Sequence, residues 1–262
     1  MKVVNLEQNI FNIENLKTYY IHVGKGRAVL ILHGWQSFSG AWREVVKLLA
    51  EKGFSVFVPD LPGFGRSFIP NEAWGIDDYV QFVLKFAKEL KIDQFILLGH
   101  SFGGQIAIKL AAFYPEKVEK LILCAPAAIR HKKRLKVRAF YILAKIGNLI
   151  FSLPLLKLIR EKIRRILYFL AREKDYQVAG DLKETMKKVI SEDTRQYLSK
   201  INSETLILWG DKDRMIPVSD ADTLKNGIVT ATIKIIKDAG HNFPYEVPKV
   251  LVSEVLTLLE EK

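Results

Sequence analysis

Short apolar runs of strand length alternate along this chain with longer segments whose apolar residues recur at helical spacing. Strands are predicted at residues 17–23, 27–32, 54–58, 94–98, 119–124, 205–209 and 231–236, and helices at 41–51, 76–90, 104–113, 219–226 and 247–260. The helix at 76–90 is expected to be capped by Asp77 or Asp78. This alternation predicts an α/β fold with a mostly parallel central sheet and helices on both faces.

A long insertion interrupts the alternation between residues 127 and 200. We therefore expect a core formed by 1–126 and 201–262 and an inserted, basic, helical segment at 127–200. The insertion holds 19 Lys and Arg against 7 Asp and Glu, whereas the rest of the chain holds 21 against 22. Essentially all of the net charge of +11 is therefore expected to lie in the insertion.

Part of this insertion, residues 139–159, is very apolar. Lys145, Asn148, Pro154 and Lys157 interrupt it and argue against a membrane-spanning helix. We favour a segment whose apolar face packs over the active site while its charges are solvated. Contact of the basic segment with an anionic membrane, or with an acidic protein partner, remains an open alternative.

Composition narrows the class of protein. A chain of 262 residues, 49% hydrophobic and 26% charged, suits one folded domain with an insertion. Cys124 is the single cysteine and is expected to be a buried core thiol, which excludes an internal disulfide framework and fits a reducing compartment. The first ten residues lack the apolar run of a signal peptide. These features predict a cytoplasmic protein, with a peripheral membrane location as the alternative.

The sequence Gly99-His100-Ser101-Phe102-Gly103 lies where a predicted strand meets a predicted helix. In such a G-x-S-x-G turn the serine occupies a strained backbone position above the edge of the sheet. The glycines allow the strand and the helix to pack closely, and the helix N-terminus faces any negative charge that forms beside the serine. Ser101 is therefore the candidate nucleophile.

A serine nucleophile needs a base and an acid, and both candidates follow it along the chain. Asp213 comes after the strand at 205–209, and His241 comes after the strand at 231–236. Both are expected at the same sheet edge as Ser101. Asp211 and Asp238 are alternative positions for the acid.

These motifs resemble the α/β-hydrolase superfamily over nearly the whole chain. The resemblance also rests on His33-Gly34-Trp35 after a strand and on the turn that begins with Asp60-Leu61-Pro62-Gly63-Phe64-Gly65. It implies a serine hydrolase in which His241 is the base and Asp213 orients it, because the acid of this family is the third residue after the glycine and precedes a proline. It implies that the backbone N–H groups of Trp35 and Phe102 form the oxyanion hole. The turn at Asp60 is expected to be structural, and His33 and His100 are expected to be scaffold.

In this superfamily the insertion at 127–200 has the position and size of a lid. The expected activity is hydrolysis of a carboxylic ester through an acyl-enzyme, with an apolar substrate of medium chain length or lipid-like character. A hydrolase of carbon–carbon bonds in vinylogous diketone acids is the nearest alternative, although such relatives typically have Asn at the position of His100. Aminopeptidase and thioesterase activities also remain open. An alternative from another class is a non-catalytic ligand-binding or receptor protein that retains the triad.

Other chemistries lack support in the sequence. The five histidines form no metal-ligand spacing, so no metal site is expected. There is no glycine pattern of a dinucleotide-binding or phosphate-binding loop, so no cofactor is expected. The basic segment carries no recognisable nucleic-acid motif, so no nucleic-acid partner is expected.

Overall fold

The computed structural model describes residues 8–13, 16–131 and 180–260. The chain divides into two compact units, the first formed by Met1–Ile129 with Glu192–Lys262 and the second by Arg130–Ser191. The insertion expected from the sequence has its boundaries at 127 and 200, so its outermost residues belong to the first unit. The apolar stretch at 139–159 lies outside the described residues.

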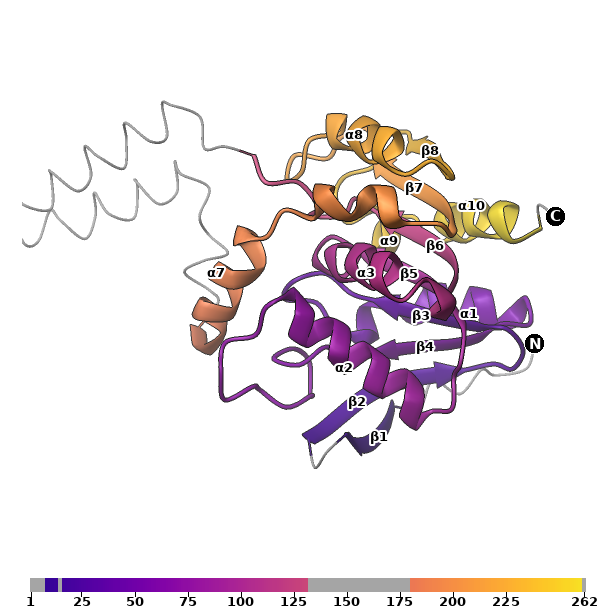
Figure 1. Ribbon diagram of the computed structural model, residues 1–262. Coiled ribbons are helices and arrows are strands. Elements are labelled where there is room, and N and C mark those ends of the chain that lie inside the picture. Colours follow the sequence, from indigo (N-terminus) through magenta and orange to yellow (C-terminus); the bar gives the residue numbers. More distant parts are fainter. Residues whose placement is uncertain (1–7, 14–15, 132–179, 261–262) are drawn as a thin grey trace, which may run out of the picture. The chain divides into compact units, whose positions relative to one another are not determined.

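An eight-stranded sheet forms the centre of the first unit (Figure 1). Its order is β1-β2-β4-β3-β5-β6-β7-β8. The strands are β1 (Gln8–Ile13), β2 (Leu16–Val23), β3 (Ala28–Leu32), β4 (Ser55–Pro59), β5 (Phe95–His100), β6 (Val118–Cys124), β7 (Glu204–Gly210) and β8 (Ala231–Ile236). The pairs β1–β2 and β2–β4 are antiparallel, and all other pairs are parallel. The predicted mostly parallel sheet is confirmed.

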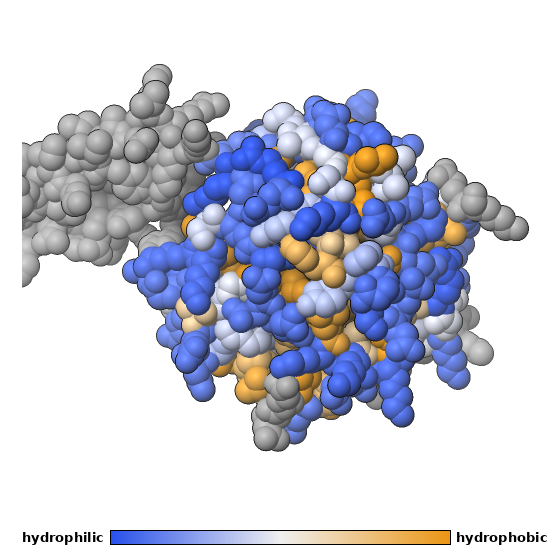
Figure 2. Space-filling model, in the orientation of Figure 1, coloured by the Kyte–Doolittle hydropathy of each residue, from blue (hydrophilic) through white to orange (hydrophobic). Residues whose placement is uncertain are grey.

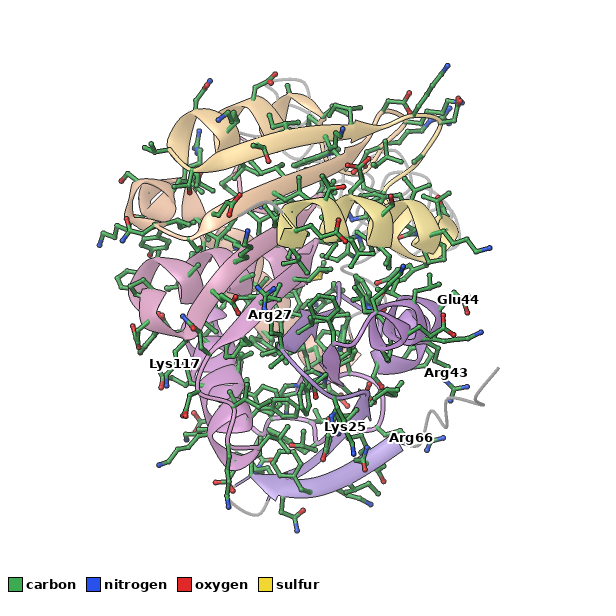
Figure 3. The ribbon with its side chains drawn as sticks, turned by 90° about the vertical axis from the view of Figure 1, so that its right-hand side faces the viewer. Lys25, Arg27, Arg43, Glu44, Arg66 and Lys117 are labelled. Carbon is green, nitrogen blue, oxygen red and sulfur yellow. The ribbon has the colours of Figure 1, made fainter. Side chains whose placement is uncertain are left out.

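Helices cover both faces of this sheet (Figures 1 and 3). On one face lie α2 (Ile76–Glu89), α3 (Phe102–Phe113), a 3-10 helix (Thr194–Lys200) and α8 (Ser219–Gly227); on the other lie α1 (Arg43–Glu51), α9 (Phe243–Glu246) and α10 (Pro248–Glu260). Helix α2 packs against α3, and α1 packs against α9 and α10. Figure 3 views the molecule from the side of α1 and α10.

The apolar runs of the sequence correspond to strands that are buried on both sides. Every residue of β5 is buried, and so are Leu121 to Cys124 at the end of β6. Fully burying one Leu or Ile side chain contributes about 1.5–3 kcal/mol. The central strands therefore hold rigidly the loops that leave their carboxyl ends. Cys124 is buried as expected, and burial raises the pKa of its thiol.

The structure differs from the prediction at some element ends. Strand β1 was not predicted, because it is an edge strand of mixed polarity whose Ile10 is 53% exposed. Neither expected aspartate is the N-cap residue of α2, but Asp78 takes part in a capping box from the first turn. Gly75 is the N-cap residue, and the Asp78 side chain in the first turn accepts a hydrogen bond from the Gly75 N–H at 2.7 Å. Asp77 instead pairs with Lys109.

In the second unit, the described part contains a short 3-10 helix (Gly180–Leu182) and α7 (Lys183–Ser191). Thr185 and Val189 are buried one turn apart, whereas Lys187 and Glu184 form an exposed ion pair. Within the described residues, no helix is long and apolar enough to cross a membrane. Hydrophilic residues dominate the face of the first unit seen in Figure 2.

Candidate active site

Ser101 occupies the sharp turn between β5 and α3. Its φ of 51° and ψ of −114° lie in a region that L-residues rarely adopt, which costs on the order of 1–3 kcal/mol. Hydrogen bonds from the Ser101 N–H to Cys124 O at 3.0 Å and from the Ala127 N–H to Ser101 O at 3.0 Å hold this conformation. Ser101 is half-buried while the residues on both sides of it are buried. The turn thus presents one hydroxyl outward from the core.

The glycines of the motif are required by close packing. A Cβ added to Gly99 would lie 2.5 Å from Gly103 O, and one added to Gly103 would lie 2.2 Å from Leu32 O. Helix α3 therefore starts in contact with the ends of both β5 and β3. This approach places the N-terminus of α3, with its unpaired N–H groups, beside the serine.

Asp213 and His241 form a hydrogen-bonded pair at the ends of β7 and β8. His241 Nδ1 donates to Asp213 Oδ2 at 2.7 Å. The Asp213 side chain has no exposed surface, and that of His241 is 6% exposed. Burial disfavours ionisation of Asp213, but hydrogen bonds from His241 and from the N–H groups of Met215 and Ile216 outweigh it and hold the pKa of the carboxyl below its usual value. The pair is thus a carboxylate that fixes which nitrogen of His241 carries the proton.

The two alternative acids are placed differently. Asp211 is exposed, and the structure gives it no contact with His241. Asp238 has a 65% exposed side chain that pairs with Lys212 at 2.5 Å. Of the three aspartates considered from the sequence, Asp213 is the one that contacts the histidine.

His241 also lies against the turn that carries the serine. Its backbone carbonyl accepts a hydrogen bond from Nε2 of His100, the residue before Ser101, at 3.0 Å, and the two imidazole rings are 4.9 Å apart. Among the described residues, no hydrogen bond joins the Ser101 hydroxyl to the His241 ring. Such bonds are often long without substrate and tighten when it binds. Ser101, Asp213 and His241 thus meet at one sheet edge.

The loop after β3 passes close to the serine. A Cβ added to Gly34 would lie 3.4 Å from Ser101 Cβ and 3.0 Å from His100 Nδ1. The rings of Trp35 and Phe102 are in contact, with centroids 5.4 Å apart. The two expected oxyanion donors, the N–H groups of Trp35 and Phe102, therefore come from neighbouring segments beside Ser101.

Hydrogen bonds of His33 and Asp60 fix the conformation of this loop. Leu61 N–H donates to His33 Nε2 at 2.9 Å, so the proton is on Nδ1, which donates to Gly34 O at 2.8 Å. Burial lowers the pKa of His33 to about 4, so it is neutral at pH 7. The buried Asp60 carboxylate accepts from the N–H groups of Ser39 and Arg66 at 2.6 and 2.9 Å. These contacts support the structural interpretation of both residues.

Two residues near the site were not found from the sequence. Tyr245, on α9, donates from its hydroxyl to His100 Nδ1 at 3.2 Å, and Ser37 lies 3.1 Å from the same hydroxyl. The one available signal was that Tyr245 follows His241 by one helical turn, and this spacing alone does not indicate a functional role. Among the described residues, no group of three or more His, Cys, Asp or Glu is arranged to hold a metal ion.

Comparisons with known proteins find similar sequences and the same fold. A sequence profile of the family described as "alpha/beta hydrolase fold" matches residues 27–142. The chain is 29% identical over 260 residues to the human (Homo sapiens) monoacylglycerol lipase ABHD6, covering 90% of this chain and 76% of that protein. It is 25% identical over 252 residues to 2-hydroxy-6-oxo-6-phenylhexa-2,4-dienoate hydrolase of Comamonas testosteroni, covering 88% and 86%. The crystal structure of a bacterial membrane phospholipase A matches with a TM-score of 0.75 and 24% identity, over 97% of this chain and 86% of that one.

The sheet order, the serine turn and these matches together define the fold. The chain has the α/β-hydrolase fold, as its motifs predicted. The similar proteins include hydrolases of different bonds, so the similarity supports a hydrolase without naming its substrate.

Proposed function

We propose that this protein is a serine hydrolase that cleaves a carboxylic ester through an acyl-enzyme intermediate. The observation that carries the proposal is the buried Asp213–His241 pair beside a serine in a strained strand-to-helix turn. Ser101 is the nucleophile, His241 the general base and then the general acid, and Asp213 the residue that fixes the proton on Nδ1 of His241.

Acylation begins when the Ser101 hydroxyl oxygen attacks the ester carbonyl carbon as its proton passes to Nε2 of His241. The carbon–oxygen bond to the alcohol then breaks, and His241 returns the proton to the departing alkoxide. In deacylation, His241 takes a proton from water, the hydroxide adds to the acyl carbon, and the carboxylic acid leaves as Ser101 regains its proton. Asp213 stays ionised throughout and stabilises the imidazolium.

The tetrahedral intermediates carry a negative oxygen that needs prepared donors. The N–H groups of Phe102 and Trp35 serve this role, together with the N-terminus of α3. Removing one such donor typically costs about 3–4 kcal/mol of barrier. Both segments rest on buried strands, which keeps the donors oriented before substrate binds.

Hydrolysis of p-nitrophenyl esters of increasing chain length tests the proposal. We expect turnover that requires Ser101, and covalent labelling of Ser101 by a fluorophosphonate probe. Ser101→Ala should abolish both, whereas the matched control Ser191→Ala, which removes an exposed hydroxyl, should retain both. A wild-type protein that is neither labelled nor active would support the non-catalytic alternative of a receptor or scaffold.

Cleavage of a carbon–carbon bond is the second candidate, because one relative is named as a hydrolase of a hexadienoate. The same three residues would serve that reaction. Turnover of a vinylogous diketone acid, measured beside the ester series, separates the two. We favour the ester because His100 occupies the position at which carbon–carbon hydrolases typically have Asn.

For the insertion, we propose that it acts as a lid over an apolar, lipid-like substrate and that its basic residues contact anionic membrane surfaces. The support is the concentration of the positive charge in residues 127–200 and the very apolar stretch within it. Two relatives are named as lipid-cleaving enzymes, a monoacylglycerol lipase and a membrane phospholipase.

A further inference from the structure

A row of hydrogen-bonded side chains leads to the backbone of His241. Ser37 Oγ lies 3.1 Å from the Tyr245 hydroxyl, which lies 3.2 Å from His100 Nδ1. His100 Nε2 in turn lies 3.0 Å from the backbone oxygen of His241. These hydrogen bonds therefore connect the loop after β3, the helix α9, the serine turn and the backbone of the candidate base.

The last acceptor, the backbone oxygen of His241, determines which group donates in each of these hydrogen bonds. A backbone carbonyl only accepts, so His100 Nε2 must carry a proton and donate to His241 O. In a neutral imidazole the other nitrogen then accepts, so the Tyr245 hydroxyl donates to Nδ1. With the Tyr245 proton used in this way, Ser37 donates to the Tyr245 oxygen. All donors point the same way, an arrangement in which each bond strengthens the next.

The surroundings keep His100 neutral. The residue is 2% exposed, and burial together with the nearby His241 lowers its pKa to about 3. Burial also raises the pKa of Tyr245, so that its hydroxyl keeps its proton. The ring of Trp42 packs edge-on against both His100 and Tyr245, with centroids 6.3 and 5.2 Å apart, which limits their movement.

We propose that Tyr245 and His100 are positioning residues that fix the backbone of His241 relative to Ser101. Tyr245 selects the tautomer of His100 that donates from Nε2, and His100 then holds the carbonyl of the residue that bears the base. The proposal rests on the proposed function of Ser101 and His241, and it adds a second support to the one Asp213 gives.

Two supports restrain His241 more than one does. Asp213 holds the imidazole ring at Nδ1, whereas His100 holds the peptide from which that ring extends. A general base must reach its proton within about 0.5 Å of the productive position, and a misplacement of 1 Å can cost about 10²-fold in rate. Without the Tyr245 hydroxyl, the opposite tautomer of His100 becomes accessible, and its bare Nε2 would face the carbonyl of His241 and repel it.

The kinetic test compares Tyr245→Phe with Tyr114→Phe, which removes an exposed hydroxyl that accepts from Gln81. We expect Tyr245→Phe to lower kcat for a p-nitrophenyl ester about 10-fold with KM changed less than twofold, and Tyr114→Phe to change neither. A packing role alone would instead lower the melting temperature without this separation of kcat from KM.

Variants at His100 test the hydrogen bond to His241 itself. His100→Gln can place an amide N–H near the position of Nε2, so it should retain more of kcat than His100→Asn, whose amide is too short. In the His100→Asn background, adding Tyr245→Phe should lower kcat by less than twofold, because the contact through which Tyr245 acts is already lost. If the kcat losses of His100→Asn and Tyr245→Phe instead multiply in the double variant, the proposed connection between the two residues is wrong.

The tautomer of His100 can also be measured directly, without any substrate. Nitrogen-15 NMR of labelled histidines should show His100 protonated at Nε2 alone from pH 5 to 9 in the wild type, and as a mixture of tautomers in Tyr245→Phe. A wild-type His100 protonated at Nδ1 overturns the inference even if the protein is not an esterase. Conversely, Ser101-dependent turnover that Tyr245→Phe leaves unchanged overturns the inference while the proposed function stands.

Discussion

His241 Nδ1 donates to Asp213 Oδ2 at 2.7 Å, while the other oxygen of Asp213 accepts from the N–H groups of Met215 and Ile216. Both oxygens of the carboxylate are therefore hydrogen-bonded, one to the loop that carries Asp213 and the other to the histidine. This division makes Asp213 a rigid orienting group, and it separates Asp213 from Asp211, whose side chain is exposed.

The first prediction follows from this pair. Asp213→Asn should lower kcat about 10³–10⁴-fold, because an amide can donate to Nδ1 and so stabilise the wrong tautomer of His241. Asp211→Asn is the matched control and should change kcat by less than threefold. Both are measured on a p-nitrophenyl ester, with circular dichroism to verify folding. If Asp211→Asn proved the more harmful, the assignment of the acid would be wrong.

The second prediction concerns acid stability. Burial lowers the pKa of His33 to about 4 and that of His100, with help from His241, to about 3, whereas an unfolded histidine titrates near 6.5. Between these values the unfolded chain binds protons that the folded chain does not. The stability contributed by the two neutral rings is therefore complete above about pH 6.5 and is lost progressively as pH falls through this window.

Urea unfolding at pH 7.5 and 5.5 measures this effect. From the two histidines, linkage predicts a loss of about 3 kcal/mol between these pH values, about half from each. His100→Gln removes one of the two groups and should reduce the loss by about half. His131→Gln, which changes an exposed histidine, should leave the loss unchanged. A loss that is the same in all three proteins would contradict the role of the buried rings.

The position of the site was predictable because few residues determine it. Parallel strands bring their carboxyl ends to one edge, so Ser101, Asp213 and His241 could be brought together from their place after apolar runs. The backbone geometry of Ser101 also followed, since the glycines around it mark a close approach of strand and helix.

The support behind the site was not predictable in the same way. The contact between Tyr245 and Ser37 joins residues 208 positions apart, and neither belongs to a motif. It depends on how α9 packs against α1 and against the loop after β3, which the hydrophobic pattern does not specify. Likewise, β1 was missed because its pairing with β2, rather than an apolar run of its own, makes it a strand.

The third prediction tests the close packing beneath the serine. A Cβ on Gly103 would lie 2.2 Å from the backbone oxygen of Leu32, so Gly103→Ala must push α3 away from β3. We expect a loss of about 2–4 kcal/mol in the free energy of unfolding, within the range of overpacked cores and strained backbones. Gly75→Ala, where the added Cβ meets nothing closer than 3.9 Å, should cost less than about 1 kcal/mol. Equal losses in denaturant melts would contradict this account.

The fourth prediction concerns Lys109 on α3. Its buried ammonium lies 2.5 Å from Glu192 and 2.8 Å from Asp77, and Glu192 is where the chain returns to the first unit. Burial opposes the charge, but the two carboxylates outweigh it and raise the pKa of Lys109. Lys109→Met should destabilise the protein by about 2–4 kcal/mol, because Glu192 is left partly buried without its cation. Lys212→Met, at the exposed pair with Asp238, should cost far less stability in the same thermal or urea melts, because water screens exposed ion pairs.

The fifth prediction tests the proposed contact of the insertion with membranes. Because residues 127–200 carry the positive excess while the rest of the chain is close to neutral, the protein should sediment with anionic vesicles at low ionic strength and little with neutral ones. Each basic group near such a surface contributes on the order of 1 kcal/mol, screened by salt within a Debye length. Reversing Lys132, Lys133 and Arg134 to Glu should weaken this binding without changing turnover of a small soluble ester.

A matched charge reversal outside the insertion distinguishes the contribution of the insertion to membrane binding from that of the net charge. Reversing Lys25, Arg43 and Lys117 to Glu removes as much positive charge from the first unit, on the surface seen in Figure 3. If the insertion itself meets the membrane, this control should retain most of the binding that the first variant loses, since charges outside the contact act only through a screened field. Equal losses in both variants would mean that net charge alone drives the association. No binding of the wild type at low salt would instead leave a lid whose charges serve only solubility.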